Sequence, residues 1–222
     1  DSILPAAALL DASLLAGLPE YHKKAAMLDA LCHGCESMWS MNSDSQSAAY
    51  AKTALEKILP NYRAYLSGDP NAAEEILAAA NLAGRAINIS QTTAAHAMSY
   101  KLTSSFGIAH GHAAALCLPE VWLAIASRTS DCKDPRGEDH LRGMLDTLSA
   151  VFGCRNTAEA VGRVREILGV LGLKKIVCTD EEKLRELAAS VNPQRLKNSP
   201  VSFNTQQLLE MYRSLLGESS DQ

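Results

Sequence analysis

The sequence predicts an all-α, multi-helix protein. Alanine and leucine, which are strong helix formers, are abundant, whereas aromatic residues make up only 5% of the 222 residues. Apolar residues recur at helical spacing along most of the chain, often behind a residue that can cap a helix. Only the short apolar run KKIVC at 174–178 has a pattern typical of a strand.

The first three helices are expected in the N-terminal part of the chain. Apolar residues at helical spacing predict a helix at 21–41. Asp44 is a good N-cap for the next helix, which contains AYAKTALEKILPNYRAYL and which Pro60 is expected to kink or end. The third helix has a strong N-terminal signal, because Asp69 can cap it and Pro70 lies in its first turn.

The middle of the chain, NISQTTAAHAMSYKLTSSFGIAHGHAAALCLPEVWLAIA, predicts two further helices around a turn. A short helix is expected around His96–Thr103, and Gly107 marks the turn that follows it. An apolar helix starts from Gly111, and Pro119 is expected to kink or divide it. The polar run RTSDCKDPRGED at 128–139 is expected to be a loop.

The C-terminal part continues the helical pattern. Four more periodic segments lie near 138–152, 156–171, 181–190 and 204–216. The sequence contains no internal repeat and no low-complexity segment. It therefore predicts one all-helical domain.

Composition limits the kind of partner. The net charge is -4 and the 21 basic residues are scattered, so nucleic-acid binding is not expected. No run of about 18 apolar residues is present, which argues against a membrane span. No secretory leader is visible, so we expect the six cysteines to be reduced thiols and the protein to be cytoplasmic.

The octet DALCHGCE at 29–36 concentrates reactive side chains in about two helical turns. Cys32 and Cys35 resemble a redox or zinc half-site, but the chain has no second CxxC pair and the pair lies in mid-helix, so packing is the expected role. Asp29 and His33 are four residues apart on one helix face and can grip one divalent ion. A surface hydrogen bond between them is the competing interpretation.

Two more histidines, His96 and His110, lie in alanine-rich segments on either side of the predicted turn at Gly107. A helix–turn–helix of this length can fold back so that both face one point. One aspartate with three imidazoles, namely Asp29, His33, His96 and His110, is a plausible ligand set for Fe(II), Zn(II), Co(II) or Ni(II). It is too rich in nitrogen for magnesium or calcium.

These motifs together resemble the iron-containing (group III) alcohol dehydrogenases. DALCHGCESMWS is similar to that family's DALxHxxE segment, and NLAGRAINISQTTAAHAMSY with FGIAHGHAAALCLPEV is similar to its long signature. VNPQRLKNSPVSFNTQQLLEMY resembles the family's C-terminal ending. The resemblance covers nearly the whole chain.

The resemblance implies the C-terminal all-helical domain of a dehydroquinate synthase-like fold. Residues 21–222 would be the metal-binding domain and 1–20 an inter-domain connection. An N-terminal NAD(P)-binding domain would be absent from this chain, which has no glycine-rich dinucleotide motif. Small alcohols or aldehydes would be the substrates, and a homo-oligomer is expected.

The resemblance also implies site residues. The metal ligands carried over are Asp29, His33, His96 and His110, with Fe(II) as the family's metal. Tyr100 stands where the family often has a histidine near the substrate, so its hydroxyl is a candidate catalytic group. The stretch QTTAAHAMSYKLT most resembles members that reduce phosphonoacetaldehyde, for which Lys101 or Arg85 could meet the phosphonate. Ala109 stands where many members have proline, which is expected to loosen the turn.

The expected mechanism is hydride transfer between a substrate held by the metal, which acts as a Lewis acid, and the nicotinamide of NAD(P). This chain would supply one wall of the cleft and is expected to be inactive alone. Two alternatives stay open at this point. One is a dehydroquinate synthase-like lyase domain, and the other is a non-catalytic module for metal binding or oligomerisation.

Overall fold

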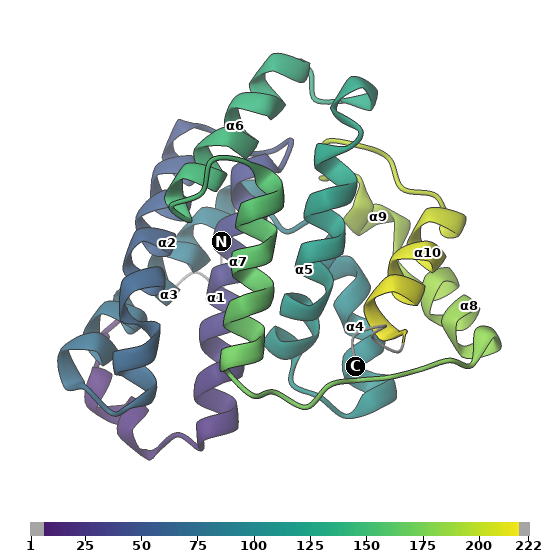
Figure 1. The fold of residues 1–222 in the computed structure, drawn as a ribbon. Helices are drawn as coiled ribbons and strands as arrows, with labels where there is room; N and C mark the ends of the chain where they lie inside the picture. The colour runs from purple at the N-terminus through teal and green to yellow at the C-terminus, as the bar shows by residue number, and fades with distance from the viewer. Residues whose placement is uncertain (1–6, 218–222) are drawn as a thin grey trace.

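Two long helices, α1 (Glu20–Trp39) and α5 (His110–Ala126), pack against each other through the middle of the molecule (Figure 1). On one side of this pair, α2 (Ser45–Leu66) and α3 (Pro70–Ser90) lie along each other and both contact α1. On the other side, α4 (Ala94–Phe106) packs against α5. The central pair therefore joins the two halves of the molecule.

The computed structural model describes residues 7–217, and every regular element in that range is helical. The all-α prediction is thus confirmed. The other elements are η1 (Ala12–Gly17), η2 (Thr129–Asp131), α6 (Glu138–Val151), α7 (Thr157–Val170), α8 (Glu181–Ser190), α9 (Pro193–Leu196) and α10 (Thr205–Leu216). α7 covers α5, α6 contacts α1, and α10 packs between α5 and α8.

The structure departs from the sequence-based expectation at 174–178, and it rules out one of the two outcomes expected at each internal proline. The segment at 174–178 forms no strand, although its last amide, that of Cys178, donates to the Leu216 carbonyl at 2.9 Å and so ties the segment to α10. Neither internal proline ends or divides its helix, since Pro60 lies within α2 and Pro119 within α5. Pro60 and the residue four before it, Glu56, are both exposed, so water can satisfy the carbonyl that the proline leaves without a partner.

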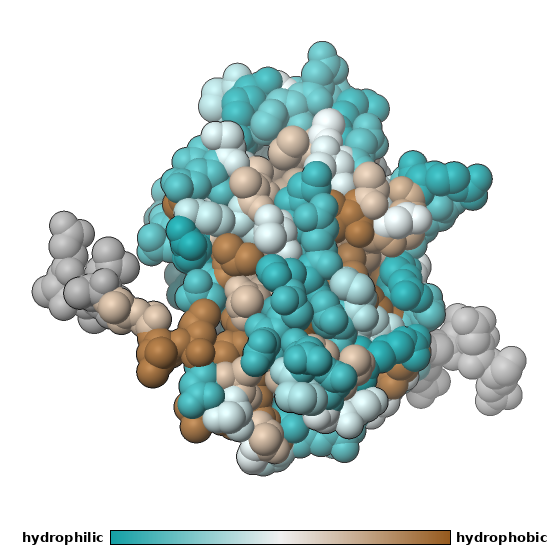
Figure 2. Space-filling view, turned by 90° about the vertical axis from the view of Figure 1, so that its left-hand side faces the viewer, coloured by the Kyte–Doolittle hydropathy of each residue, from teal (hydrophilic) through white to brown (hydrophobic). Residues whose placement is uncertain are grey.

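The segment before α1 is only partly described. Asp11 caps η1 by accepting from the Ser13 amide at 2.9 Å, and residues 1–6 lie outside the described part of the chain. That 1–20 connects two domains stays a prediction. Figure 2 shows a largely hydrophilic face that carries a hydrophobic patch. Two leucines, Leu9 before η1 and Leu14 within it, are exposed by 95% and 76%.

Helix length and composition also bear on membrane insertion. Among residues 7–217 we find no helix that combines the length and the apolar character needed to cross a bilayer.

Two glycines allow neighbouring helices to approach α1 closely. A Cβ added to Gly34 would lie 2.9 Å from Leu55 Cγ on α2. A Cβ added to Gly111 would lie 2.1 Å from the Ala25 carbonyl oxygen and 2.6 Å from Asp29 Cβ, both on α1. The close approach at Gly111 brings the start of α5 against Asp29.

Gly111→Ala is therefore expected to destabilise the fold by about 3 kcal/mol or more, because the new methyl group overlaps backbone that cannot move aside. Gly143→Ala is the matched control, since Gly143 is exposed on α6 with no atom near the added Cβ. The control should stabilise the protein by up to about 1 kcal/mol through helix propensity. Urea unfolding measures both, and equal stability of the two variants would contradict the close packing.

Candidate metal centre

Three helices bring the four predicted ligands together. Asp29 and His33 lie one turn apart on α1, His96 lies in the first turn of α4, and His110 is the first residue of α5. Gly107, with a φ of 65°, ends α4 in the left-handed conformation that glycine tolerates and reverses the chain. The predicted helix–turn–helix is thus present, and it directs His96 and His110 toward α1.

A hydrogen bond to α1 holds the turn before His110 in place. The Ala109 amide donates to the Tyr21 hydroxyl at 2.8 Å, and the same hydroxyl lies 3.2 Å from His112 Nδ1. A proline at position 109 would lack this donor. The contact to α1 therefore compensates for the proline whose absence was expected to loosen the turn.

The side chains of the cluster converge on Asp29. Its Oδ1 lies 3.5 Å from His96 Nε2 and 3.8 Å from His110 Nε2, and its Oδ2 lies 3.7 Å from His33 Nε2. The ligand atoms of Asp29, His96 and His110 all lie within 4.8 Å of one another. His33 completes the group by stacking on His96, with ring centres 4.6 Å apart.

Two atoms at the centre of this cluster are buried without a hydrogen-bond partner, namely Asp29 Oδ1 and His96 Nε2. A buried polar atom without a partner is costly, by roughly 1 to 3 kcal/mol. A divalent cation between a carboxylate and imidazole nitrogens would satisfy both atoms. The donor set of one oxygen and three nitrogens fits Fe(II), Zn(II), Co(II) or Ni(II).

His96 is held by a carboxylate from the opposite side. Glu36 is fully buried on α1, and its Oε2 contacts His96 Nδ1. Its Oε1 accepts from the Thr93 hydroxyl at 2.5 Å, the Thr93 amide at 3.0 Å and the Ala95 amide at 3.1 Å. Glu36 therefore caps the N-terminus of α4 and also directs His96 Nε2 toward Asp29, which is the usual support of a ligating histidine.

Electrostatics link these groups closely. Burial disfavours a charged His96, but Glu36 and Asp29 outweigh burial and raise the pKa of His96 to about 9. Burial and the neighbouring His96 lower the pKa of His33 to about 4. Burial alone would raise the pKa of Asp29, yet the surrounding histidines lower it. Two carboxylates thus favour positive charge at His96, in the position where a cation would replace the proton.

An open pocket lies over this cluster. Its lining combines Asp29, His33, His96 and His110 with side chains from α3, α4 and α9 and from the loops beside them, including Gln91, Tyr100, Arg195 and Asn198. The Tyr100 ring stacks on His110, with ring centres 5.0 Å apart. The Tyr100 hydroxyl accepts from Arg195 at 2.7 Å. Tyr100, the predicted catalytic residue, therefore stands at the edge of the pocket.

The two cations considered from sequence lie elsewhere. Lys101 Nζ pairs with Glu186 on α8 at 2.8 Å, and Lys101 is not among the pocket-lining residues. Arg85 lies over the Tyr50 ring, with its guanidinium carbon 4.1 Å from the ring centre. The guanidinium that lines the pocket belongs to Arg195, which sequence reasoning did not single out. Its only signal was its place in the family-like C-terminal ending.

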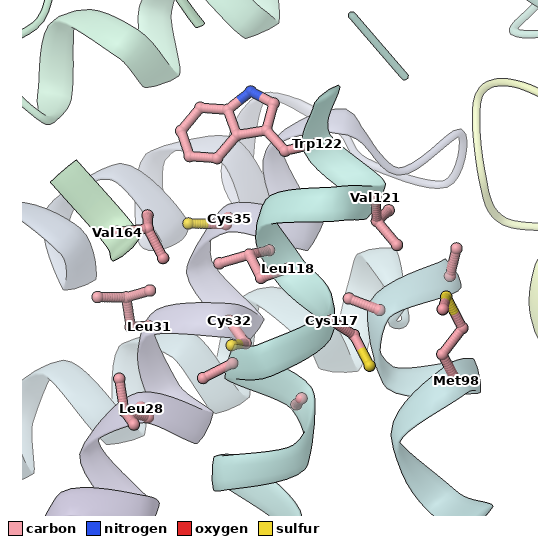
Figure 3. Packing of buried hydrophobic residues seen from close by; sticks show 14 of the residues in the cluster. Leu28, Leu31, Cys32, Cys35, Met98, Cys117, Leu118, Val121, Trp122 and Val164 are labelled. Carbon is pink, nitrogen blue, oxygen red and sulfur yellow. The ribbon is translucent and has the colours of Figure 1, made fainter. Parts of the chain in front are cut away.

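The cysteines of the octet belong to the core. Cys32 and Cys35 are free, fully buried, and lie between α1 and α5 beside Leu118 and Trp122 (Figure 3). Burial, together with the nearby Glu36 carboxylate, raises the pKa of each thiol well above its usual value. The packing role expected for both cysteines is confirmed, and their high pKa values argue against thiolate chemistry.

Similarity to known proteins shows the family of this chain. The model of the "Fe-containing alcohol dehydrogenase family, C-terminal" matches residues 23–216. The chain belongs to this family. A phosphonoacetaldehyde reductase from Streptomyces viridochromogenes is 34% identical over 99% of this chain and 55% of its own length. A 1,3-propanediol dehydrogenase from Citrobacter freundii is 27% identical over 95% of this chain and 55% of its own length.

Solved structures agree on the fold. The iron-containing alcohol dehydrogenase of Thermotoga maritima matches 94% of this chain and 53% of its own, with a TM-score of 0.78 and 27% identity. A sulfoacetaldehyde reductase from Bifidobacterium kashiwanohense, solved with NAD+, has a TM-score of 0.78 at 22% identity over 95% of this chain and 54% of its own. The chain therefore spans about half the length of the relatives that it matches.

Glu36→Gln is expected to lower the free energy of unfolding by about 3 kcal/mol or more, because it breaks a buried charged contact with His96. Glu56→Gln is the control, since that carboxylate is 52% exposed and lies 3.8 Å from Lys52. An exposed pair contributes at most about 1 kcal/mol. Denaturant unfolding of both variants decides the point, and equal losses would show that Glu36 does not hold α4.

Proposed function

We propose that this domain is the metal-binding half of a NAD(P)-linked alcohol dehydrogenase or aldehyde reductase, with Asp29, His33, His96 and His110 as the ligands of its metal. The observation that carries the proposal is the pair of unsatisfied buried atoms, Asp29 Oδ1 and His96 Nε2, at the centre of these side chains. Membership of the iron-containing family supports Fe(II) as the metal.

Each residue of the site has a task in this proposal. Asp29, His33, His96 and His110 would hold the metal, whose Lewis acidity would polarise the oxygen of an aldehyde or alcohol. Glu36 fixes the tautomer and the direction of His96 through Nδ1. Tyr100 accepts a hydrogen bond from Arg195, so its own proton is free to be donated to a substrate oxygen in the pocket.

A second domain is the proposed partner. The relatives are about twice as long as this chain, and one structural neighbour was solved with NAD+. We propose that a nucleotide-binding domain faces the open pocket and brings the nicotinamide to the substrate. The relatives' names support hydride transfer rather than the lyase alternative, and the first of them supports phosphonoacetaldehyde as the substrate.

His96→Ala is expected to lose stoichiometric metal, falling from about one ion per chain to less than about 0.1, because one ligand and the contact to Glu36 both disappear. His112→Gln is the control, since His112 is also buried, lies on α5 and contacts Tyr21 rather than Asp29. Elemental analysis after Fe(II) or Zn(II) loading and desalting gives the metal content. Unchanged metal in His96→Ala would refute the ligand set.

Activity is expected to require both the metal and the nucleotide-binding domain. The 222 residues alone should show no aldehyde-dependent NAD(P)H oxidation, since they form only one wall of the proposed cleft. The same domain within the full-length enzyme should oxidise NAD(P)H, lose that activity with a chelator and regain it with Fe(II). Turnover by the isolated chain, followed by absorbance, would contradict the two-domain proposal.

A further inference from the structure

Arg195 stands out among the cations of the described chain. It is exposed on α9 and lines the pocket above the proposed metal ligands. No carboxylate within residues 7–217 pairs with it, although most other arginines of that range form ion pairs. Its partner is instead the uncharged Tyr100 hydroxyl. An unneutralised guanidinium that faces a pocket is suited to bind an anion.

Two sets of contacts fix the position of Arg195. Its guanidinium carbon lies 4.3 Å from the centre of the Tyr100 ring, so the cation stacks on a rigid surface. Asn198, on the segment that follows α9, donates to Gln91 Oε1 at 3.0 Å and to the Thr92 carbonyl at 3.1 Å. Its carbonyl also accepts from the Met41 amide at 2.9 Å. The arginine is therefore held before any ligand arrives, which reduces the entropy lost on binding.

Stacking contacts connect Arg195 to the proposed metal site through the Tyr100 ring. The guanidinium lies 4.3 Å from the Tyr100 ring centre, which lies 5.0 Å from the His110 ring centre, so guanidinium and imidazole are at most 9.3 Å apart. A small molecule can thus contact both. One end would meet the histidine cluster and the other would meet the guanidinium.

We propose that Arg195, supported by Tyr100, forms a subsite for the anionic end of a short-chain aldehyde or alcohol, such as a phosphonate, sulfonate or carboxylate. The proposal rests on the proposed function for the oxidoreductase reaction, but the subsite itself is a binding site. Guanidinium groups bind such oxyanions through two parallel hydrogen bonds. Neutral substrates gain nothing from this contact, so Arg195 determines specificity for charge.

Two other cations, Lys101 and Arg85, do not line the pocket above the proposed metal ligands. Lys101 is neutralised by Glu186, and Arg85 lies in a separate surface hollow that contains none of the proposed metal ligands. Arg85 nevertheless repeats the local arrangement of Arg195, because it stacks on a tyrosine ring and donates to that tyrosine's hydroxyl. This makes Arg85 a matched control for the loss of an arginine stacked on tyrosine.

The test uses the metal-loaded, full-length enzyme and phosphonoacetate, an anion that cannot be reduced. Calorimetry should show that Arg195→Gln raises the Kd for phosphonoacetate by about 10- to 100-fold, which is the effect of removing a charge-assisted contact. Arg195→Lys should give an intermediate Kd, and Arg85→Gln should leave the Kd unchanged. An unchanged Kd in Arg195→Gln overturns the proposal.

Two further measurements separate substrate binding by Arg195 from cofactor binding and from a general loss of activity. A Kd for NADPH or NADH that rises in Arg195→Gln, with phosphonoacetate binding unaltered, would assign the arginine to the cofactor's phosphates and overturn the proposal. In aldehyde reduction by Arg195→Gln, the ratio of kcat/KM for phosphonoacetaldehyde to kcat/KM for propanal should fall about 10- to 100-fold, because both aldehydes share any loss that comes from the contact with Tyr100. Equal losses would overturn charge specificity. If neither aldehyde is reduced by the wild-type enzyme yet Arg195 binds phosphonoacetate, the proposed function fails and the subsite stands.

Discussion

A single buried carboxylate sets the arrangement of the site. Glu36 lies inside the molecule, where an unsatisfied charge would be prohibitively costly, and the N-terminus of α4 supplies the donors that it needs. The same carboxylate contacts His96 Nδ1, so the start of α4 and the direction of its histidine are fixed together. With α4 in place, the turn at Gly107 returns the chain to α1. The position of His110 then depends on the close contact that Gly111 permits.

The site and the core use the same helices on different faces. α1 directs Asp29 and His33 to the pocket while Cys32 and Cys35 pack beneath them against α5 (Figure 3). Because these faces belong to one rigid element, the cluster is held by the packing that stabilises the fold. The open side of the pocket is completed by α9, which arrives from far along the chain. A rigid inner wall with polar ligands and an outer rim with a cation is well suited to hold a small polar molecule.

Local patterns predicted much of this arrangement, and long-range contacts explain what they missed. Two local features could be predicted from the sequence, because each depends on residues that are close together in the chain. These are the i,i+4 spacing of Asp29 and His33 and the turn between His96 and His110. The position of Arg195 in the pocket could not be predicted from the sequence, because only the folded chain brings α9 over Tyr100. Lys101 follows Tyr100 directly and therefore points about 100° away around the helix, toward α8.

Glu36 shows the same limit in another form. Its spacing from Asp29 places it on the neighbouring part of α1, but its role depends on the amides of Thr93 and Ala95, nearly 60 residues away. Similarly, Pro60 has the local signature of a helix end, yet packing of α2 against α1 and α3 keeps the helix continuous through it. Tertiary contacts outweigh a single helix-breaking residue here.

X-ray absorption spectroscopy of the zinc-loaded protein tests the central claim most directly. Our account predicts a first shell of oxygen and nitrogen at about 2.0 to 2.1 Å, with the outer-shell scattering typical of about three imidazoles and no sulfur. A zinc–sulfur shell at about 2.3 Å would instead assign the metal to the cysteines. That result, or a shell without imidazole scattering, would contradict the role proposed for Asp29, His33, His96 and His110.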